Sequence, residues 1–289
     1  MPVLALITFS FAALLAGLIV GVLFNRRAFE ARVDAEVADL FAEVETMPTY
    51  FDASELEGLP APVRRFFERN LHQGQPHPSC LRARQEGSMR DKPGQPMTEF
   101  VGELYLVANP PGMLWFARLR PLPLVWIDSC QVYLRGRAQV RSKLLSSLST
   151  VDAKDDGTRR ATAVQYLAEL ALLPPALLPG DHLRWEAVDD ERARVILRDG
   201  ELEVSGVFAF DELGNIVGFS SEDRVHSDRP DASWRVRYGE HRAFGELQLP
   251  TMFEVEWHTP ETVFASASWQ IMVVEVDVPR RWTSGAKTA

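Results

Sequence analysis

The sequence predicts an α+β fold that is mainly β: a large, curved antiparallel sheet, half-barrel-like, with helices on its concave face. Three observations lead to this fold. An uncharged apolar run opens the chain, apolar and polar residues alternate from residue 80 onward, and one helical insertion interrupts that alternation. About a dozen strands, joined mostly by hairpins, form a sheet so wide that it must curl. A two-sheet sandwich is the alternative architecture.

The 289 residues divide into four expected parts. They are a transmembrane anchor at 1–27, a helical linker and helical start of the domain at 28–79, one β-rich domain at 80–280 with a helical insertion at 158–180, and a disordered tail at 281–289. A composition of 46% hydrophobic and 25% charged residues is typical of a folded protein. The net charge of −9, with basic residues scattered among acidic ones, argues against nucleic-acid binding.

The apolar run extends from Val3 to Phe24 without a charged residue. As a helix it would be about 33 Å long, enough to cross a hydrocarbon core of about 30 Å. A cleaved signal peptide is the alternative, but the run is longer than a typical signal core and no Lys or Arg precedes it. Asn25 and the arginines after it also stand where a cleavage motif would be. We therefore expect a single-pass anchor in the cell membrane.

The orientation of this anchor is predicted from three arginines. Arg26, Arg27 and Arg32 follow the run, whereas the short segment before it carries only the α-amino group. The positive-inside rule places the large domain in the cytoplasm. A periplasmic domain remains the alternative.

Two helices are expected between the anchor and the sheet. After the arginines, apolar residues recur at helical spacing between acidic ones, which predicts an amphipathic helix that ends before Pro48. Its apolar residues are Phe29, Val33, Val37, Leu40, Phe41 and Val44. We expect this stripe to pack on the domain, with a partner helix as the alternative. Pro60 and Pro62 suit the start of a second helix over 59–71, and a loop follows at 72–79.

From residue 80 onward, a period of two predicts successive strands separated by turn residues. The expected strands are 81–89, 99–107, 113–120, 124–129, 131–141, 193–197, 202–210, 216–221, 233–238, 248–258, 262–271 and 272–278. Asp199 and Gly200 form a tight turn within a three-stranded meander. In the strand after this turn, Phe208 and Phe210 share the face of Leu202, so both should be buried.

Catalytic and metal-binding motifs are largely missing, and no cofactor is expected. The chain lacks a nucleophile elbow, a phosphate-binding loop, a dinucleotide fingerprint and an H-E-x-x-H helix motif. His72, His77 and Cys80 have metal-like spacing, but no fourth ligand is evident and solvated histidines are common in such loops. Cys80 and Cys130, the only cysteines, are expected to be unpaired small apolar residues, with a disulfide as the alternative.

Four residues form the expected ligand-binding site. Glu169 lies in an apolar helix, where a carboxylate is costly to bury unpaired, although it would also be satisfied by solvent or by an arginine. Tyr166 precedes it by one helical turn. Trp115 and Tyr133 belong to a cluster of aromatic residues in the middle strands. Such residues usually pack in the core, and the alternative hypothesis is that they form an apolar wall facing a ligand.

Several segments resemble a bacterial family of unknown function. The most specific are the Leu-Pro-x-Pro-Val segment at 59–63 and the Pro-x-Ala-Leu-Leu-Pro segment at 174–179, and the resemblance covers roughly residues 59–257. It implies a membrane span followed by arginines, but no activity. The chain departs from the family where members often have an aromatic residue, since Leu172 and Leu173 precede the prolines here. The order of strands and helices also resembles that of periplasmic lipoprotein carriers. Those are unclosed half-barrels with an apolar cavity, and their export conflicts with a cytoplasmic domain.

The predicted function is that of a membrane-tethered, non-enzymatic binding protein for a lipid or acyl chain. A membrane-associated interaction scaffold, which would bind another membrane protein through the amphipathic helix and a sheet edge, is the first alternative, and an unrecognised hydrolase is the second. A deep apolar cavity would support the first function and a filled core with an exposed apolar patch the second. Carboxylates or histidines clustered in a cleft would support hydrolysis.

Overall fold

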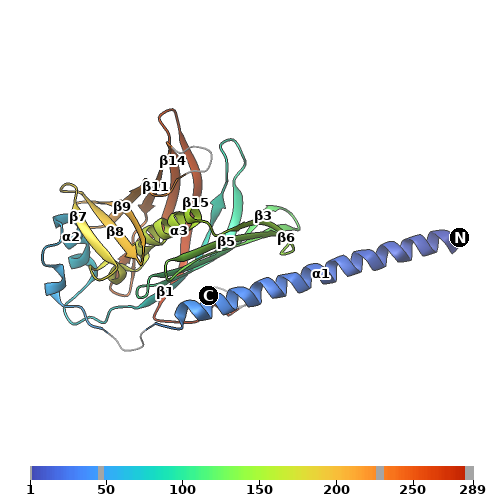
Figure 1. The fold of residues 1–289 in the computed structure, drawn as a ribbon, viewed down its shortest axis with the longest axis horizontal. Helices are drawn as coiled ribbons and strands as arrows, with labels where there is room; N and C mark the ends of the chain where they lie inside the picture. Colours follow the sequence, from blue (N-terminus) through green and yellow to red (C-terminus); the bar gives the residue numbers. More distant parts are fainter. Residues whose placement is uncertain (1, 45–48, 226–230, 284–289) are drawn as a thin grey trace.

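A computed structural model describes residues 2–44, 49–225 and 231–283 (Figure 1). The helices are α1 (Pro2–Phe41), η1 (Ala53–Leu56), α2 (Ala61–Asn70), α3 (Asp156–Glu169), η2 (Leu170–Leu172) and η3 (Pro174–Leu177). The strands are β1 (Cys80–Met89), β2 (Thr98–Val107), β3 (Gly112–Leu122), β4 (Val125–Leu134), β5 (Arg137–Leu144), β6 (Leu148–Ala153), β7 (Leu183–Ala187), β8 (Arg192–Asp199), β9 (Leu202–Phe210), β10 (Ile216–Ser221), β11 (Ser233–Gly239), β12 (Arg242–Phe244), β13 (Leu247–Leu249), β14 (Met252–His258) and β15 (Val263–Val276).

Thirteen of these strands form one antiparallel sheet, which confirms the predicted fold class. Its order is β6-β5-β4-β3-β2-β1-β15-β14-β11-β10-β9-β8-β7, so two meanders are joined where the first strand of the sheet pairs with the last. The sheet curves strongly but does not close, because β6 and β7 are its two edges (Figure 1). The result is the half-barrel expected of so wide a sheet.

The helical insertion links those two edges. Because β6 and β7 are far apart in the sheet, the segment α3-η2-η3 between them crosses the concave face instead of making a hairpin (Figure 1). α3 is capped by Asp155, whose carboxylate accepts a hydrogen bond from the Thr158 amide at 2.8 Å. It ends before Pro174 and Pro175, which cannot continue a helix. The concave face is therefore largely covered by one piece of chain.

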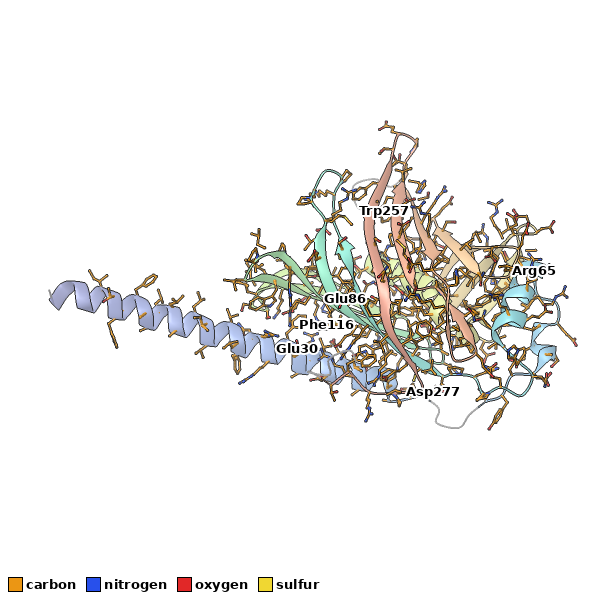
Figure 2. The ribbon with its side chains drawn as sticks, turned by 180° about the vertical axis from the view of Figure 1, so that it is seen from behind. Glu30, Arg65, Glu86, Phe116, Trp257 and Asp277 are labelled. Carbon is orange, nitrogen blue, oxygen red and sulfur yellow. The ribbon has the colours of Figure 1, made fainter. Side chains whose placement is uncertain are left out.

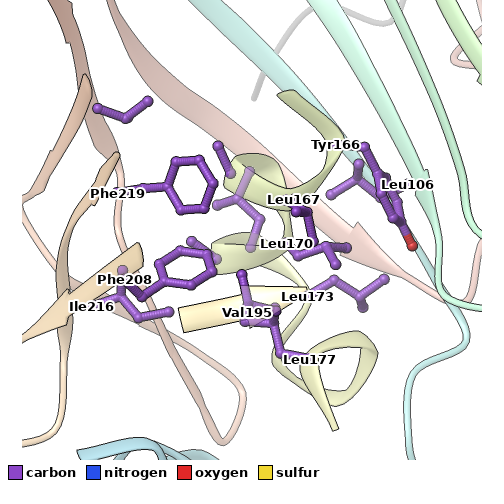
Figure 3. Packing of buried hydrophobic residues seen from close by; sticks show 14 of the residues in the cluster. Leu106, Tyr166, Leu167, Leu170, Leu173, Leu177, Val195, Phe208, Ile216 and Phe219 are labelled. Carbon is purple, nitrogen blue, oxygen red and sulfur yellow. The ribbon is translucent and has the colours of Figure 1, made fainter. Parts of the chain in front are cut away.

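The main core lies between this segment and the concave face (Figure 3). Leu167, Leu170 and Leu173 project from the helical segment toward the strands, where they meet apolar side chains such as Phe208. Phe208 is 0% exposed and Phe210 is 3% exposed, which confirms the face predicted for β9. A closely packed interior of this kind leaves little room except where polar or small residues interrupt it.

A second core covers the convex face. Alternation along the strands sends Tyr105, Leu114 and Phe116 to the side opposite the main core, where they meet the amphipathic half of α1. Val33, on that half, is 0% exposed, so the expected packing of this stripe on the domain is confirmed. Glu30 accepts hydrogen bonds from Arg118 and Arg281 at 2.9 and 2.7 Å and lies close to Phe116 in Figure 2.

The N-terminal half of α1 projects away from the domain (Figure 1). Its side chains from Ile7 to Phe24 are almost all exposed, although this stretch carries no charge. The helix is long and apolar enough to cross a membrane, and a signal sequence has the same character. α1 ends at Phe41, ahead of Pro48, which lies outside the described residues.

Four expectations about strands are wrong. The strand expected over 248–258 is divided, because β13 pairs with β12 in a separate two-stranded sheet and β14 begins only at Met252. β4 runs without interruption through Cys130, and its turn to β5 falls at Arg135 and Gly136, whose φ angles of 51° and 67° suit a tight hairpin. Residues 263–276 form one strand because β15 pairs with a neighbour on both sides. β6 and β7 were not among the expected strands. β6 is exposed along almost its whole length and does not alternate, whereas β7 alternates but spans only five residues.

The start of the C-terminal tail is held against the convex side of the domain. Arg281 donates to Glu103 and Asp34 at 3.1 and 2.8 Å, and the Trp282 ring lies 4.0 Å from the Arg82 guanidinium. Residues 284–289 of the tail that was expected to be disordered lie outside the described residues.

Candidate functional site

A cavity of about 340 Å³ lies on the concave side between α3 and the sheet. This volume is within the range of small-molecule sites. Its walls are mostly apolar and include four of the seven tryptophans, Trp115, Trp234, Trp257 and Trp269, together with Phe100, Phe253, Val236 and Val255. Asp91 and Val225, which also line it, are exposed to solvent. The cavity is therefore an apolar pocket that is accessible from the surface.

One stripe of α3 forms the helical side of the cavity. Ala161, Gln165, Ala168 and Glu169 recur at the spacing of a single helix face. The other faces of α3 carry larger apolar residues, among them Leu167, which fill the main core. Small and polar residues on an otherwise apolar helix thus leave the space that the cavity occupies.

Glu169, the last residue of α3, is the buried acid of this cavity. It is 2% exposed, and its Oε2 atom is buried without a hydrogen-bond partner. Burial raises the pKa of Glu169 from 4.5 to about 8, although the positive charge of Arg224 acts in the opposite direction. The carboxyl group is therefore mainly protonated at neutral pH and can donate a hydrogen bond into the cavity.

Arg224 is the cationic group beside it. Its Nη1 atom donates to the Ala161 carbonyl at 2.9 Å and to Gln165 Oε1 at 3.1 Å, and its guanidinium lies 4.6 Å from the centre of the Trp234 ring. Burial lowers the pKa of Arg224 to about 10, so the group stays charged at neutral pH. The positive charge of Arg224 acts on Glu169, but the buried Oε2 atom of Glu169 accepts no hydrogen bond from it.

The aromatic walls are held in place by their own contacts. Trp115 Nε1 donates to Gln85 Oε1 at 2.9 Å, and the Trp115 ring meets Phe100 edge-on at 5.7 Å. Trp269 stacks on Phe253 with ring centres 5.1 Å apart. Rings fixed in this way form a preorganised apolar surface, which loses little conformational freedom when a ligand binds.

The structure brings together two of the four residues expected at the site. Trp115 and Glu169 both line the cavity. Tyr133 and Tyr166 instead lie in the core beside each other, with ring centres 5.7 Å apart, and neither lines the cavity. Their hydroxyls donate to Asp199 Oδ2 and to the Val107 carbonyl, at 2.8 and 2.9 Å, which satisfies them within the fold.

Sequence reasoning missed Arg224 and the tryptophans of β11, β14 and β15 as site residues. Arg224 follows β10 in a connecting segment, and only tertiary contact with α3 places it beside Glu169. The stripe of small and polar residues on α3 was the available signal. The metal hypothesis gains no support, since no cluster of His, Cys, Asp or Glu suited to a metal occurs among the described residues. Cys80 and Cys130 are buried free thiols.

The solved structures that match this chain share little sequence with it. A domain described as an outer membrane lipoprotein-sorting protein, from Vibrio parahaemolyticus, has a TM-score of 0.40 and 8% identity over 69% of this chain and 86% of its own. A DUF1329 family protein from Desulfovibrio piger has a TM-score of 0.42 and 9% identity over 75% of this chain and 91% of its own. A LolA superfamily protein from Nitrosomonas europaea has a TM-score of 0.41 and 11% identity over 75% of this chain and 94% of its own.

Two of these three descriptions name lipoprotein sorting or the LolA superfamily. None of the curated proteins compared with the sequence matches it significantly. The model of a family of unknown function, DUF6544, matches residues 49–269, which include the whole cavity, and the chain belongs to this family.

Proposed function

We propose that this protein is a membrane-tethered binding protein whose concave cavity holds an apolar ligand with one polar end, such as a lipid or an acyl chain. The observation that carries the proposal is the buried carboxyl group of Glu169, whose Oε2 atom lacks a partner inside a tryptophan-walled cavity. A buried polar group without a partner is costly, and a ligand that supplies the missing hydrogen bond removes that cost.

The charges suggest the chemistry of the polar end. With Glu169 protonated and Arg224 charged, both groups donate hydrogen bonds and the net charge of the pair is positive. A carboxylate or ester oxygen at the end of an acyl chain would accept from both groups. The tryptophan rings would then contact the chain itself.

Binding is favoured over hydrolysis by the composition of the cavity. Among the described residues that line it, there is no histidine or cysteine, and Glu169 has no nucleophile hydrogen-bonded to its Oε2 atom. A hydrolase needs a nucleophile or an activated water within hydrogen-bond reach of a base. Anchorage by α1 would keep the cavity near a source of lipid.

The first experiment is lipid extraction and mass spectrometry of the full-length protein purified in mild detergent. We expect a co-purifying species with an acyl chain. A fatty acid with a nitroxide on its chain, added to delipidated protein, should quench the fluorescence of the cavity tryptophans. Quenching that saturates as the concentration of the labelled fatty acid rises would measure binding to a site. Quenching that only follows the partitioning of the fatty acid into detergent micelles would contradict the proposal.

Arg224→Met is the informative variant in that assay. Loss of a charge-assisted hydrogen bond should weaken binding roughly ten- to hundredfold, because such a bond contributes about 1.5–3 kcal/mol. Arg235→Met is the matched control, since Arg235 is an exposed arginine that follows Trp234 on β11 and does not line the cavity. Equal affinities of the two variants would rule out Arg224 as the anchor of the polar end.

A further inference from the structure

Two hairpin tips of the sheet carry exposed leucines. Leu122 and Leu124 lie at the β3–β4 turn and are 64% and 93% exposed, and Leu148 begins β6 at the β5–β6 turn and is 64% exposed. We call these three residues the tip patch. Large apolar side chains grouped at turns are unusual on a surface that meets only water, because turns normally carry polar residues or glycine.

The backbone of the β3–β4 turn makes this choice of residue more unusual. Leu124 has a φ of 64°, in the left-handed region that glycine and asparagine adopt most readily. A leucine at that position is strained, and in this chain it gains no intramolecular burial in return. Leu124 therefore exposes an apolar side chain to solvent at a backbone position that favours glycine or asparagine.

The tip patch lies beside the end of the apolar run of α1. Asn25 Nδ2 donates to Ser147 Oγ at 3.1 Å, and the Arg26 guanidinium lies 5.9 Å from the centre of the Trp126 ring. Asn25 and Arg26 directly follow the uncharged run that ends at Phe24. If that run spans a bilayer, both hairpin tips are at the depth of its headgroups.

The residues around the patch suit that depth. Trp126 is half-buried and donates from Nε1 to Ser146 Oγ at 3.0 Å, so one side of the ring is polar and the other apolar, as in the aromatic belts of membrane proteins. Arg26 and Arg27 provide positive charge for lipid phosphates. The nearby Asp128 is 0% exposed and pairs with Arg118 at 2.6 Å, so it presents no negative charge to the surface.

We propose that the tip patch inserts into the interfacial layer of the same bilayer that anchors α1. This inference rests on the proposed membrane anchorage of α1 and goes beyond it. Contact at the helix and at both tips would hold the domain at a defined angle on the membrane. By strand register, the β1–β2 hairpin, which supplies Met89 and Arg90 to the cavity, lies at the same end of the sheet as the β3–β4 tip. The cavity would then face the membrane side of the domain.

Depth-dependent fluorescence quenching tests this arrangement with the full-length protein. The protein is reconstituted into vesicles of phosphatidylcholine and phosphatidylglycerol, and an environment-sensitive fluorophore is attached to Leu124→Cys or Leu148→Cys. The native cysteines, Cys80 and Cys130, are buried and should not label in the folded protein. Insertion into the interfacial layer should shift the emission of both probes to the blue, and nitroxide lipids labelled near the headgroup should quench both probes.

Two further positions separate the outcomes. Leu213→Cys is the matched surface control, because Leu213 is 67% exposed in the β9–β10 turn at the opposite end of the strands. Leu14→Cys reports on the apolar run itself and should be quenched by labels deep in the acyl chains. If the Leu14 probe is quenched but the Leu124 and Leu148 probes are quenched no more than the Leu213 probe, tip insertion is refuted. Membrane anchorage by α1 would still stand in that case.

Other results also decide the matter. Absence of quenching at Leu14 would refute the anchorage on which the inference rests. A blue shift at Leu124 that depends on protein concentration, without quenching by lipid, would mean that the patch binds another protein molecule and would overturn the proposal. Quenching at Leu124 and Leu148 with none at Leu213 supports it.

Discussion

Replacing Glu169 by glutamine should remove a pH dependence from the stability of the folded domain. The pKa of this carboxyl group is about 8 in the folded protein, against 4.5 for an ordinary glutamate. Between these values the unfolded chain has lost the proton and the folded protein retains it. The free energy of unfolding therefore falls as pH rises through this window, and above about pH 8 it no longer changes on account of this group.

The magnitude follows from the width of the window. From about pH 5 to the folded pKa of about 8 is about 3 pH units, and at 1.36 kcal/mol per unit the wild-type protein loses roughly 4 kcal/mol from this group alone. Glutamine does not titrate, so Glu169→Gln should lack this loss. The stability of the variant relative to wild type should thus increase by roughly the same amount between pH 5 and pH 9.

Urea unfolding of the full-length protein in detergent micelles, followed by tryptophan fluorescence, measures this difference. Comparison of the two proteins at each pH cancels the other titrating groups. Glu212→Gln is the control, because Glu212 is exposed in the β9–β10 turn, and its curve should stay parallel to wild type. If the Glu169→Gln curve is also parallel to wild type from pH 5 to pH 9, the carboxyl group is not desolvated and the argument for a buried acid in the cavity fails.

Three other predictions concern the two cores and the anchor. Phe208→Ala should lower the free energy of unfolding by about 3–5 kcal/mol, because Phe208 is fully buried in the main core; a loss below about 1 kcal/mol in urea unfolding would contradict that packing. Leu40→Ala, on the convex side, should cost about 2–5 kcal/mol, whereas Leu23→Ala, on the exposed part of α1, should leave unfolding in micelles unchanged. The protein should remain in membranes after a carbonate wash, and a reporter fused after Ala289 should be active only if it works in the cytoplasm; alkaline phosphatase activity from that fusion would place the domain in the periplasm.

The two faces of the sheet pack against different parts of the protein. The convex face binds the amphipathic half of α1 through a small apolar core and through the ion pairs of Glu30 with Arg118 and Arg281. The concave face carries the main core and the cavity. The position of α1 on the convex face leaves the cavity free of the anchor, so the proposed tether and the proposed ligand site do not compete for space.

Local pattern was sufficient to predict much of the fold. The uncharged run at the N-terminus, the alternation from residue 80 onward and the helical insertion each depend on neighbouring residues, and periodicity reports which of those side chains share a face. Phe208 and Phe210 were assigned to a buried face on that basis, and Glu169 stood out because a charged residue lay among apolar ones.

Only the tertiary structure decided how those elements meet. The pairing of β1 with β15 joins the first and last strands of the sheet and makes β6 and β7 its edges, so α3 must cross the concave face. That crossing brings Arg224 to Glu169 and leaves Tyr133 and Tyr166 in the core instead of in the cavity. A period of two determines which face a side chain takes. It carries no information about which distant strand lies alongside, because that choice depends on burying both faces of the whole sheet at once.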